Sequence, residues 1–353
     1  MKLLHEYKDT RYSQETPKKR QQCQLEALRR NRAFSPEIYL GLARVEQYNI
    51  PKKTISIGEI LMCPTMNDLE PGADYVLIMR QLPEERSLVA LLQEQDMATI
   101  RGHIHLLAEH IAHIHTQLLI THPGNDNEAW STYGQLREKL RHNFGLLNLV
   151  LETHKPDLDY DYLRTIIPWL EEKLQKLFNL DIYQQYFEQR EREQRIRLCH
   201  GDLKSPNIWI LPYNEASHGK SGQYVKILDA IDFNPTYCNI DILSDFAMLA
   251  IDIQMRTGSV VFANEMIEDY LEITDQNNEL AHAILDFYLI EKAFVGAAIS
   301  IVYDDLPQFG MRLLDVAVTR LRTLLEQQGL FASAMQEATE EQSMEDNNVV
   351  AVV

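Results

Sequence analysis

The sequence lacks the features of a membrane, secreted or disulfide-stabilised protein. Its longest apolar run, residues 294–303, falls well short of the roughly 18 residues that a membrane-spanning helix needs. No apolar segment of the secretion-signal kind follows Met1. The four cysteines lie far apart without a Cys-x-x-Cys spacing, which argues against a zinc site and a disulfide framework. We therefore expect a cytoplasmic protein in which residues 294–303 belong to a buried helix.

Basic residues are also few. The chain has 34 Lys and Arg against 52 Asp and Glu, which gives a formal net charge of −18. Such an acidic surface repels phosphate backbones and anionic membranes, so we expect no nucleic acid and no membrane as partner. Cationic ligands, or anionic ones whose charge a metal carries, remain compatible. With 353 residues, 45% hydrophobic and 24% charged, the composition is that of a globular protein long enough for two lobes.

The amino-terminal part has the pattern of a small mixed lobe. Thr16 followed by Pro17 is typical of a helix N-cap and first helical position, so we expect a helix that ends near Phe34. Residues 54–62 and 74–80 carry strand-like apolar runs separated by turn residues. One helix with a few strands makes an α+β lobe.

After Pro83 the pattern becomes mainly helical. Helical periodicity extends over residues 87–119, 160–178, 182–194 and 241–330, with a strand-and-loop region at 195–232. The acidic and polar carboxy terminus predicts a disordered tail. We expect an α+β chain with a small lobe at 1–82, a large helical lobe at 83–330 and the tail at 331–353.

The segment most informative about chemistry begins at residue 200 and reads His-Gly-Asp-Leu-Lys-Ser-Pro-Asn. A short strand-like approach ends at Asp202, Asn207 opens an apolar run five residues later, and a further strand, residues 224–228, delivers Asp229. Phosphoryl transfer needs one carboxylate to orient a hydroxyl proton and oxygen ligands for Mg²⁺. Carboxylate and amide oxygens suit such a hard cation. The set therefore predicts a phosphotransferase site.

Residues 200–207 resemble the H-G-D-x-x-x-x-N catalytic loop of the aminoglycoside phosphotransferase and choline-kinase-like group. With residues 31–41, 75–83, 227–234 and 240–249, the chain is similar to an uncharacterised bacterial branch of that group, often fused to an ATPase domain. The resemblance implies a two-lobed, protein-kinase-like fold. It also implies that ATP and Mg²⁺ serve to phosphorylate a hydroxyl of a small molecule.

The resemblance also implies roles for individual residues. Asp202 would be the catalytic base, while Asn207 and Asp229 would hold Mg²⁺. Asp232 is a rival for the metal position, because Ile-Asp-Phe at 231–233 also resembles the metal motif. We favour Asp229, because it directly follows the predicted strand.

Other matched positions would support the loop and the nucleotide. His200 would buttress the catalytic loop, and Asp245 would tie its backbone from a following helix. Lys204 stands where serine/threonine protein kinases carry a lysine near the transferred phosphate, whereas the bacterial branch usually has histidine, so its role is open. Residues 79–82, from Met79 onward, would form the hinge whose backbone meets adenine.

The amino-terminal lobe departs from the family pattern. Glu26 matches the helix glutamate that pairs with the ATP-phosphate lysine, but the glycine-containing hairpin and lysine-bearing strand that should precede it are missing. No glycine occurs before Gly41. Lys2 or Lys8 could supply the lysine, although neither has a convincing strand around it. The lobe is either truncated at Met1, which we favour, or degenerate.

Plainer interpretations stay open for several of these residues. Glu26 could form an ordinary pair with arginines of its own helix. Asp241 and Asp245 could cap the helix that follows them. Five histidines could suggest a metal site, but they lack a metalloprotease spacing, and we interpret them as partly exposed helix residues: His103, His105, His110, His113 and His115.

Two other functions are compatible with the same residues. A nucleotide-binding pseudokinase or regulatory module would keep the catalytic loop without efficient transfer, and the incomplete small lobe favours it. Metal-dependent hydrolysis by the acidic cluster would release phosphate without an acceptor. The acceptor itself and the oligomeric state cannot be read from the sequence.

Overall fold

The computed structural model describes residues 2–3, 16–49, 54–94, 96–121, 132–212, 223–232 and 234–347. The chain divides into two compact units, one of residues 1–139 and 185–282 and one of residues 140–184 and 283–353. All candidate site residues named above for catalysis, metal or nucleotide lie in the first unit. The predicted lobe boundary at residue 82 falls inside this unit and stays a prediction.

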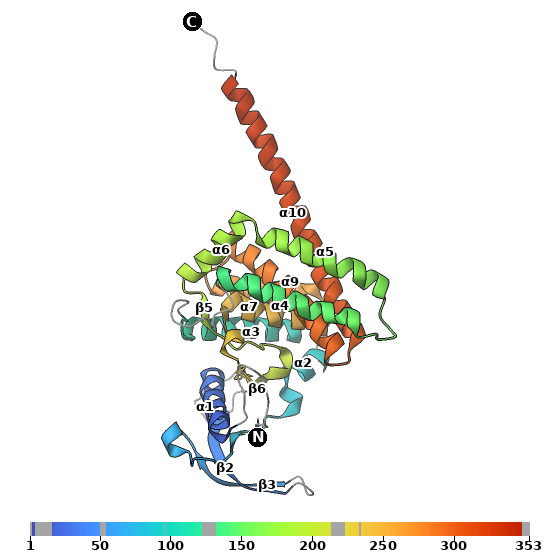
Figure 1. Cartoon of the computed structure of the whole chain (residues 1–353). Helices are drawn as coiled ribbons and strands as arrows, with labels where there is room; N and C mark the ends of the chain where they lie inside the picture. Colours follow the sequence, from blue (N-terminus) through green and yellow to red (C-terminus); the bar gives the residue numbers. More distant parts are fainter. Residues whose placement is uncertain are drawn as a thin grey trace. The chain divides into compact units, whose positions relative to one another are not determined.

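A four-stranded antiparallel sheet occupies the amino-terminal part of the first unit (Figure 1). Its spatial order is β1-β4-β2-β3, formed by β1 (Lys2–Leu3), β4 (Tyr75–Met79), β2 (Tyr39–Asn49) and β3 (Thr54–Leu61). In the register, Leu77 of β4 lies opposite both Lys2 and Leu42. The strands predicted at 54–62 and 74–80 are confirmed as β3 and β4.

Helix α1 (Pro17–Phe34) is the predicted first helix and begins where the sequence indicated. Thr16 caps it by accepting a backbone hydrogen bond at 3.3 Å, and Pro17 fills a position whose missing N–H has no helical partner. Leu28 joins Leu42 of the sheet in one buried cluster, which fixes the helix against the strands. The α1 face away from this cluster is therefore free to meet other segments.

Helices make up most of the rest of the first unit. They are α2 (Leu88–Glu94), α3 (Met97–Gln117), α7 (Ile242–Thr257) and α8 (Val260–Ile273). Helices α3 and α8 run in the same direction, because Arg101 pairs with Glu265 at 2.7 Å and, one turn on, His105 pairs with Asp269 at 3.0 Å. Two short antiparallel pairs complete this unit: β5 (Ile196–Leu198) with β8 (Asn239–Asp241), and β6 (Ile208–Pro212) with β7 (Gln223–Ile227).

A buried ion pair anchors the start of α7. Asp241 caps this helix by accepting the Leu243 N–H at 2.9 Å, as one sequence interpretation held. The same carboxylate pairs with the Arg190 guanidinium at 2.6 Å, and the two side chains are 0% and 1% exposed. Gln276 accepts a further Arg190 hydrogen bond at 2.6 Å. The position of α7 is thus set by a fully partnered buried charge.

Aromatic stacking dominates the second unit. The Phe144 and Phe294 rings stack with centroids 4.6 Å apart, and Phe178 packs against Phe287 at 5.9 Å. These rings come from α4 (Tyr133–Asn148), α5 (Tyr160–Phe178) and α9 (Glu279–Val302), whereas most of α6 (Asp181–Arg192), including Arg190, belongs to the first unit. The helix expected at 294–303 lies in α9 up to Val302 and is mostly buried, although Ile299 and Tyr303 are exposed; α4 was not predicted.

Helix α10 (Pro307–Asn347) continues through most of the stretch that we expected to be a disordered tail. Its first half packs on α5, where Arg322 lies 5.3 Å over the Trp169 ring and Tyr162 donates to Asp315 at 3.1 Å. Beyond residue 330 the sequence is rich in Ala, Glu, Gln and Met, which are strong helix formers. That propensity outweighs the low hydrophobicity on which the tail prediction relied. Residues 348–353 lie outside the described part.

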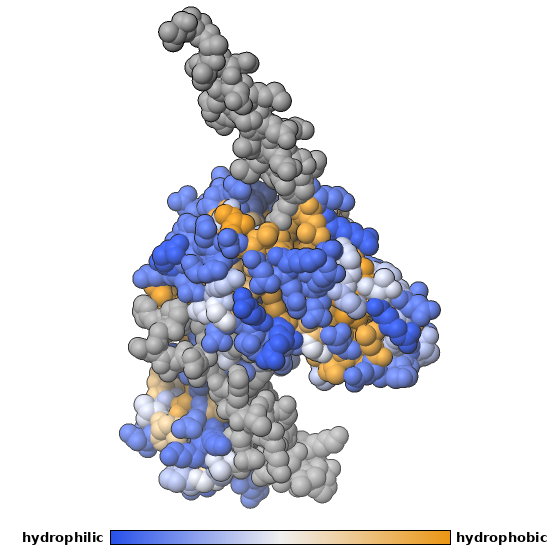
Figure 2. All heavy atoms as spheres, turned by 45° about the horizontal axis from the view of Figure 1, so that its top comes forward, coloured by the Kyte–Doolittle hydropathy of each residue, from blue (hydrophilic) through white to orange (hydrophobic). Residues whose placement is uncertain are grey.

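The fold class predicted from the sequence, α+β with a small sheet-bearing part and a large mainly helical part, is confirmed. Among the described helices, none is long and apolar enough to cross a membrane. On the face drawn in Figure 2, hydrophilic side chains predominate and hydrophobic ones show in patches between them.

Candidate functional site

The segment after β5 forms a tight loop whose backbone requires glycine. Gly201 has φ of 83°, in the left-handed region, and a Cβ there would lie 2.7 Å from the backbone oxygen of Tyr237. A one-turn 3₁₀ helix (Ser205–Asn207) follows and leads directly into β6. Asp202 and Asn207 therefore stand at the two ends of one short, rigid turn.

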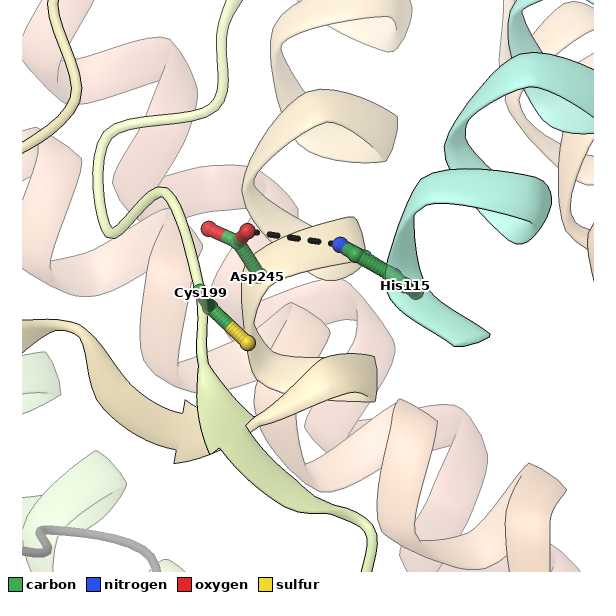
Figure 3. Close-up of side chains that lie close together, drawn as sticks. All are labelled: His115, Cys199 and Asp245. Carbon is green, nitrogen blue, oxygen red and sulfur yellow. Dashed lines mark hydrogen bonds and ion pairs between the residues drawn. The ribbon is translucent and has the colours of Figure 1, made fainter. Parts of the chain in front are cut away.

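Asp245 of α7 holds the backbone of this loop. Its two carboxylate oxygens accept the consecutive N–H groups of His200 and Gly201, each at 2.9 Å. The side chain is 1% exposed, and His115 of α3 lies 3.4 Å from the same carboxylate (Figure 3). Burial alone would raise the pKa of Asp245, but the hydrogen bond and charge of His115 and the His200 N–H lower it below its ordinary value. An ionised carboxylate thus fixes the loop.

His115, Cys199 and Asp245 bring three potential metal ligands within 4.8 Å of one another (Figure 3). Each already has a protein partner: His115 Nδ1 contacts the Tyr270 hydroxyl at 2.8 Å, and the Cys199 thiol contacts the Ile240 carbonyl at 3.4 Å. Burial raises the pKa of Cys199 well above its usual value, so the thiol stays protonated. The cluster is therefore a satisfied hydrogen-bond network that supports the loop.

This network corrects our interpretation of the histidines. His103 and His115 are buried, at 5% and 1% exposure, rather than partly exposed. His105 and His113 are exposed and bind Asp269 and Gln117. The α3 face with His115 points into the core because it follows the apolar stripe of that helix.

His200 links the loop to the segment after β7. The ring is fully buried; its Nε2 lies 2.8 Å from the Leu228 carbonyl, and its Nδ1 accepts the Asp202 N–H at 3.2 Å. A neutral imidazole with the proton on Nε2 satisfies both bonds; this tautomer is assigned from the partners. Phe34 of α1 meets the ring edge-on at 5.1 Å. His200 therefore buttresses the loop and does not face solvent.

Asp202 lies between an amide and an ammonium group. The Asn207 side-chain nitrogen donates to its backbone oxygen at 2.9 Å and to its Oδ2 at 3.2 Å. Lys204 Nζ lies 3.0 Å from its Oδ1, and the exposed fractions of Lys204 and Asp202 are 42% and 28%. The carboxylate is thus oriented by the protein and still reachable from solvent.

Asp252 of α7 is a further residue that supports the loop. It accepts the Ser205 N–H at 2.8 Å and the Ser205 hydroxyl, and pairs with Arg256 at 2.9 Å. Only 14% of its side chain is exposed. It follows Asp245 by seven residues, which places both carboxylates on one face of α7. This seven-residue spacing could have identified Asp252 from the sequence.

The segment after β7 presents the two rival metal ligands differently. Asp229 is exposed and has φ of 60°, whereas Asp232 is 8% exposed. Aspartate adopts the left-handed region more readily than most residues, and Asp275 and Asp305 also do so in this chain. The segment is joined to the 200–207 loop through the Leu228 N–H, which donates to the Asn207 carbonyl at 2.8 Å. Asp229 therefore directly follows Leu228, whose backbone is hydrogen-bonded to Asn207.

Glu26 of α1 pairs with arginines of its own helix, at 2.7 Å with Arg29 and 2.6 Å with Arg30. Burial would raise the pKa of Glu26, but these hydrogen bonds lower it to about 2. Such contacts agree with the plainer interpretation of Glu26. Lys2 lies in β1 opposite Leu77, so it does occupy a strand, while Lys8 falls outside the described residues.

The expected hinge, residues 79–82, follows β4, which is the last strand of this sheet along the sequence. Met79 ends β4 opposite Tyr39, and the Arg80 N–H donates to the Ile38 carbonyl at 2.9 Å. Met79 and Leu82 both pack against the buried cluster of the sheet and α1. The 79–82 connection is therefore held to the sheet at its start.

The structure brings Asp202, Asn207 and the 228–231 backbone together but does not gather three carboxylates. Among the described residues, Asp202, Asp229 and Asp232 do not form a three-ligand group within 4.8 Å. Mg²⁺ commonly takes only one or two protein ligands and completes its shell with water and phosphate oxygens. Asn207 donates through its nitrogen, which leaves the amide oxygen for a hard cation. This donor chemistry fits Mg²⁺.

Comparisons with solved structures give distant likenesses, among them two kinases. No protein-family model matches the chain, and a search of curated proteins finds no match. A choline kinase from Cryptosporidium parvum Iowa II has a TM-score of 0.44 and 13% identity, with 73% of each chain covered. A Plasmodium vivax ethanolamine kinase has a TM-score of 0.37 and 17% identity; the match covers 70% of this chain and 65% of the kinase chain.

Proposed function

We propose that the protein is an ATP- and Mg²⁺-dependent phosphotransferase that phosphorylates a hydroxyl of a small molecule. The observation that carries the proposal is the contact of Asn207 with the oriented, solvent-accessible Asp202, beside a segment that delivers Asp229. Phosphoryl transfer depends mainly on positioning and on charge neutralisation, and this arrangement supplies groups for both.

In this proposal Asp202 orients the acceptor hydroxyl and takes its proton. Lys204, 3.0 Å from Asp202, places a positive charge where the transferred phosphoryl group carries negative charge. The Asn207 amide oxygen and the Asp229 carboxylate hold the divalent cation, with Asp232 as the alternative ligand. When bound, the cation neutralises charge on the phosphates.

The sheet, α1 and the hinge are proposed to bind the nucleotide in a protein-kinase-like manner. Backbone groups near Met79 would meet adenine, and Lys2 or Lys8 would be the lysine that binds the phosphates. Glu26 is proposed as the partner of that lysine, which would require it to exchange an arginine contact. A cytoplasmic location and the absence of nucleic-acid and membrane partners remain our expectations from composition.

The direct test is a screen for ATP-dependent phosphate incorporation into pooled small metabolites. The wild-type protein with γ-labelled ATP and Mg²⁺ should label at least one hydroxylated compound. The Asp202→Asn variant, which keeps the size of the side chain but removes its charge and one acceptor oxygen, should label none. Equal labelling by both proteins would contradict the assigned base.

A nucleotide-binding module without transfer is the second candidate, favoured by the Glu26 contacts with Arg29 and Arg30. It predicts nucleotide binding with neither labelled product nor phosphate release. Hydrolysis by the acidic residues instead predicts phosphate release without an acceptor. Measuring free phosphate and labelled product in one assay separates the three functions.

A further inference from the structure

The backbone of residues 227–231 has a hydrogen-bond partner at every N–H. Three partners are side chains from the end of α1 and the start of β2: Ser35 for Ile227 at 3.0 Å, Tyr39 for Asp229 at 2.9 Å and Asn31 for Ala230 at 2.9 Å. The catalytic loop supplies the other two, since the Asn207 and His200 carbonyls accept the N–H groups of Leu228 and Ile231 at 2.8 and 3.0 Å. No backbone donor of the segment is left to water.

A carbonyl of the segment is held from the same side. Arg30 donates to the Ile231 oxygen at 2.9 Å and also contacts Cys238. Arg30, Asn31, Ser35 and Tyr39 are all buried, at 7%, 2%, 0% and 2% exposure. Burying such polar groups is unfavourable unless they are paired, and the 227–231 segment supplies their partners.

Asp229 lies at the centre of this set of contacts. Its left-handed conformation is one that aspartate can adopt, and the contacts on both sides select it here. Asp229, at φ of 60°, has its N–H bound by Tyr39 and the next N–H bound by Asn31. Burial raises the pKa of Tyr39, so the hydroxyl stays neutral and can accept this bond.

We propose that Asn31, Ser35 and Tyr39 are positioning residues that fix the 227–231 backbone so that Asp229 is presented to the divalent cation. This inference rests on the proposed function. It also gives a function to residues 31–41, which resemble the bacterial branch but were assigned no role from the sequence. The amino-terminal part then acts on the cation site through three side chains and the backbone that they bind.

Tyr39→Phe tests the inference, because it removes one hydroxyl and keeps the ring. Tyr75→Phe is the matched control: Tyr75 is also buried in the sheet, and its hydroxyl accepts the Glu70 N–H at 2.9 Å, away from the 227–231 segment. Two readouts are used, amide hydrogen exchange over 227–232 without nucleotide, and Mn²⁺ affinity measured by electron paramagnetic resonance with a non-hydrolysable ATP analogue.

Losing one such hydrogen bond should weaken Mn²⁺ binding by about fivefold and speed exchange of the Asp229 amide by a similar factor. Tyr75→Phe should change neither quantity. If Tyr39→Phe does not fold, Ser35→Ala, which loses the Ile227 bond, should shift both readouts in the same direction.

Wild-type Mn²⁺ affinity in Tyr39→Phe, with or without faster exchange, would overturn the positioning role. An equal loss of affinity in Tyr75→Phe would also overturn it, because a general loosening of the sheet would then be responsible. Failure of the wild-type protein to bind Mn²⁺ with the analogue has a different signature, since it contradicts the proposed function itself and this inference with it.

Discussion

The side-chain nitrogen of Asn207 lies 3.2 Å from the Oδ2 of Asp202 and 2.9 Å from the backbone oxygen of the same residue. The bond links residues five positions apart and gives the carboxylate a fixed direction. Because the amide donates through nitrogen, its oxygen is left for a cation. One relationship therefore connects the proposed base with the proposed metal ligand.

Asp202→Asn should abolish phosphoryl transfer and leave nucleotide binding nearly unchanged. An amide cannot take the hydroxyl proton, and loss of a general base commonly lowers the rate by about 10²–10⁴-fold. The measurement is product formation together with the nucleotide dissociation constant. Full activity in this variant would remove Asp202 from the mechanism.

Asp229→Asn and Asp232→Asn should separate the two rival metal ligands. Asparagine tolerates the left-handed conformation at position 229, so this variant removes the charge without adding backbone strain. We expect Asp229→Asn to remove the Mg²⁺ dependence of nucleotide binding, and Asp232→Asn to keep most of it. The reverse pattern, measured by nucleotide titration with and without Mg²⁺, would assign the cation to Asp232.

Asp245→Asn should destabilise the protein by about 2–3 kcal/mol, because one of two buried N–H groups would lose its acceptor and face an amide nitrogen. Denaturant unfolding measures this change. Asp315→Asn is the control, since it alters an exposed acceptor of one Tyr162 bond and should stay within about 0.5 kcal/mol of wild type. Equal stabilities of the two variants would contradict the support that we assign to Asp245.

His110 should make the protein less stable as the pH falls. Burial, aided by the positive charge of Lys226, lowers the pKa of His110 from 6.5 to about 4, while Glu37 acts in the opposite direction. Since the unfolded chain binds this proton first, the stability contribution is complete above pH 6.5 and is lost as the pH falls towards 4.

The check compares melting temperatures of wild type and His110→Gln from pH 7 to 4.5. The variant should lose less stability than wild type over this range, because it has no proton to gain. Parallel curves would show that His110 does not carry the expected pH dependence.

Local signals predicted much of the fold. Helix α1 was found from the Thr16 cap and Pro17, and the helix at 160–178 from its apolar period, because both signals lie within the element itself. Strand β2 and helix α4 were missed. The strand mixes charged and apolar residues, and its 11-residue length depends on pairing with both neighbours.

The site could be predicted only where its residues lie close together in the sequence. Asp202 and Asn207 share one loop, so their motif could be read directly. The contacts of Tyr39, Ser35 and Asn31 with residues 227–230 span 190 to 199 positions, and no local pattern marks such partners. Asp252 is an intermediate case. Its contact with the loop is distant in sequence, but its seven-residue spacing from Asp245 places both carboxylates on one face of α7.

The melting temperature of the wild-type protein, measured with ATP alone, Mg²⁺ alone and both together, tests the central claim most directly. At one hundred times the dissociation constant a ligand stabilises by about 2.7 kcal/mol, which raises the melting temperature by several degrees. We predict that rise only when ATP and Mg²⁺ are both present. No rise, or an equal rise without Mg²⁺, would contradict a cation held by Asn207 and Asp229 beside a nucleotide.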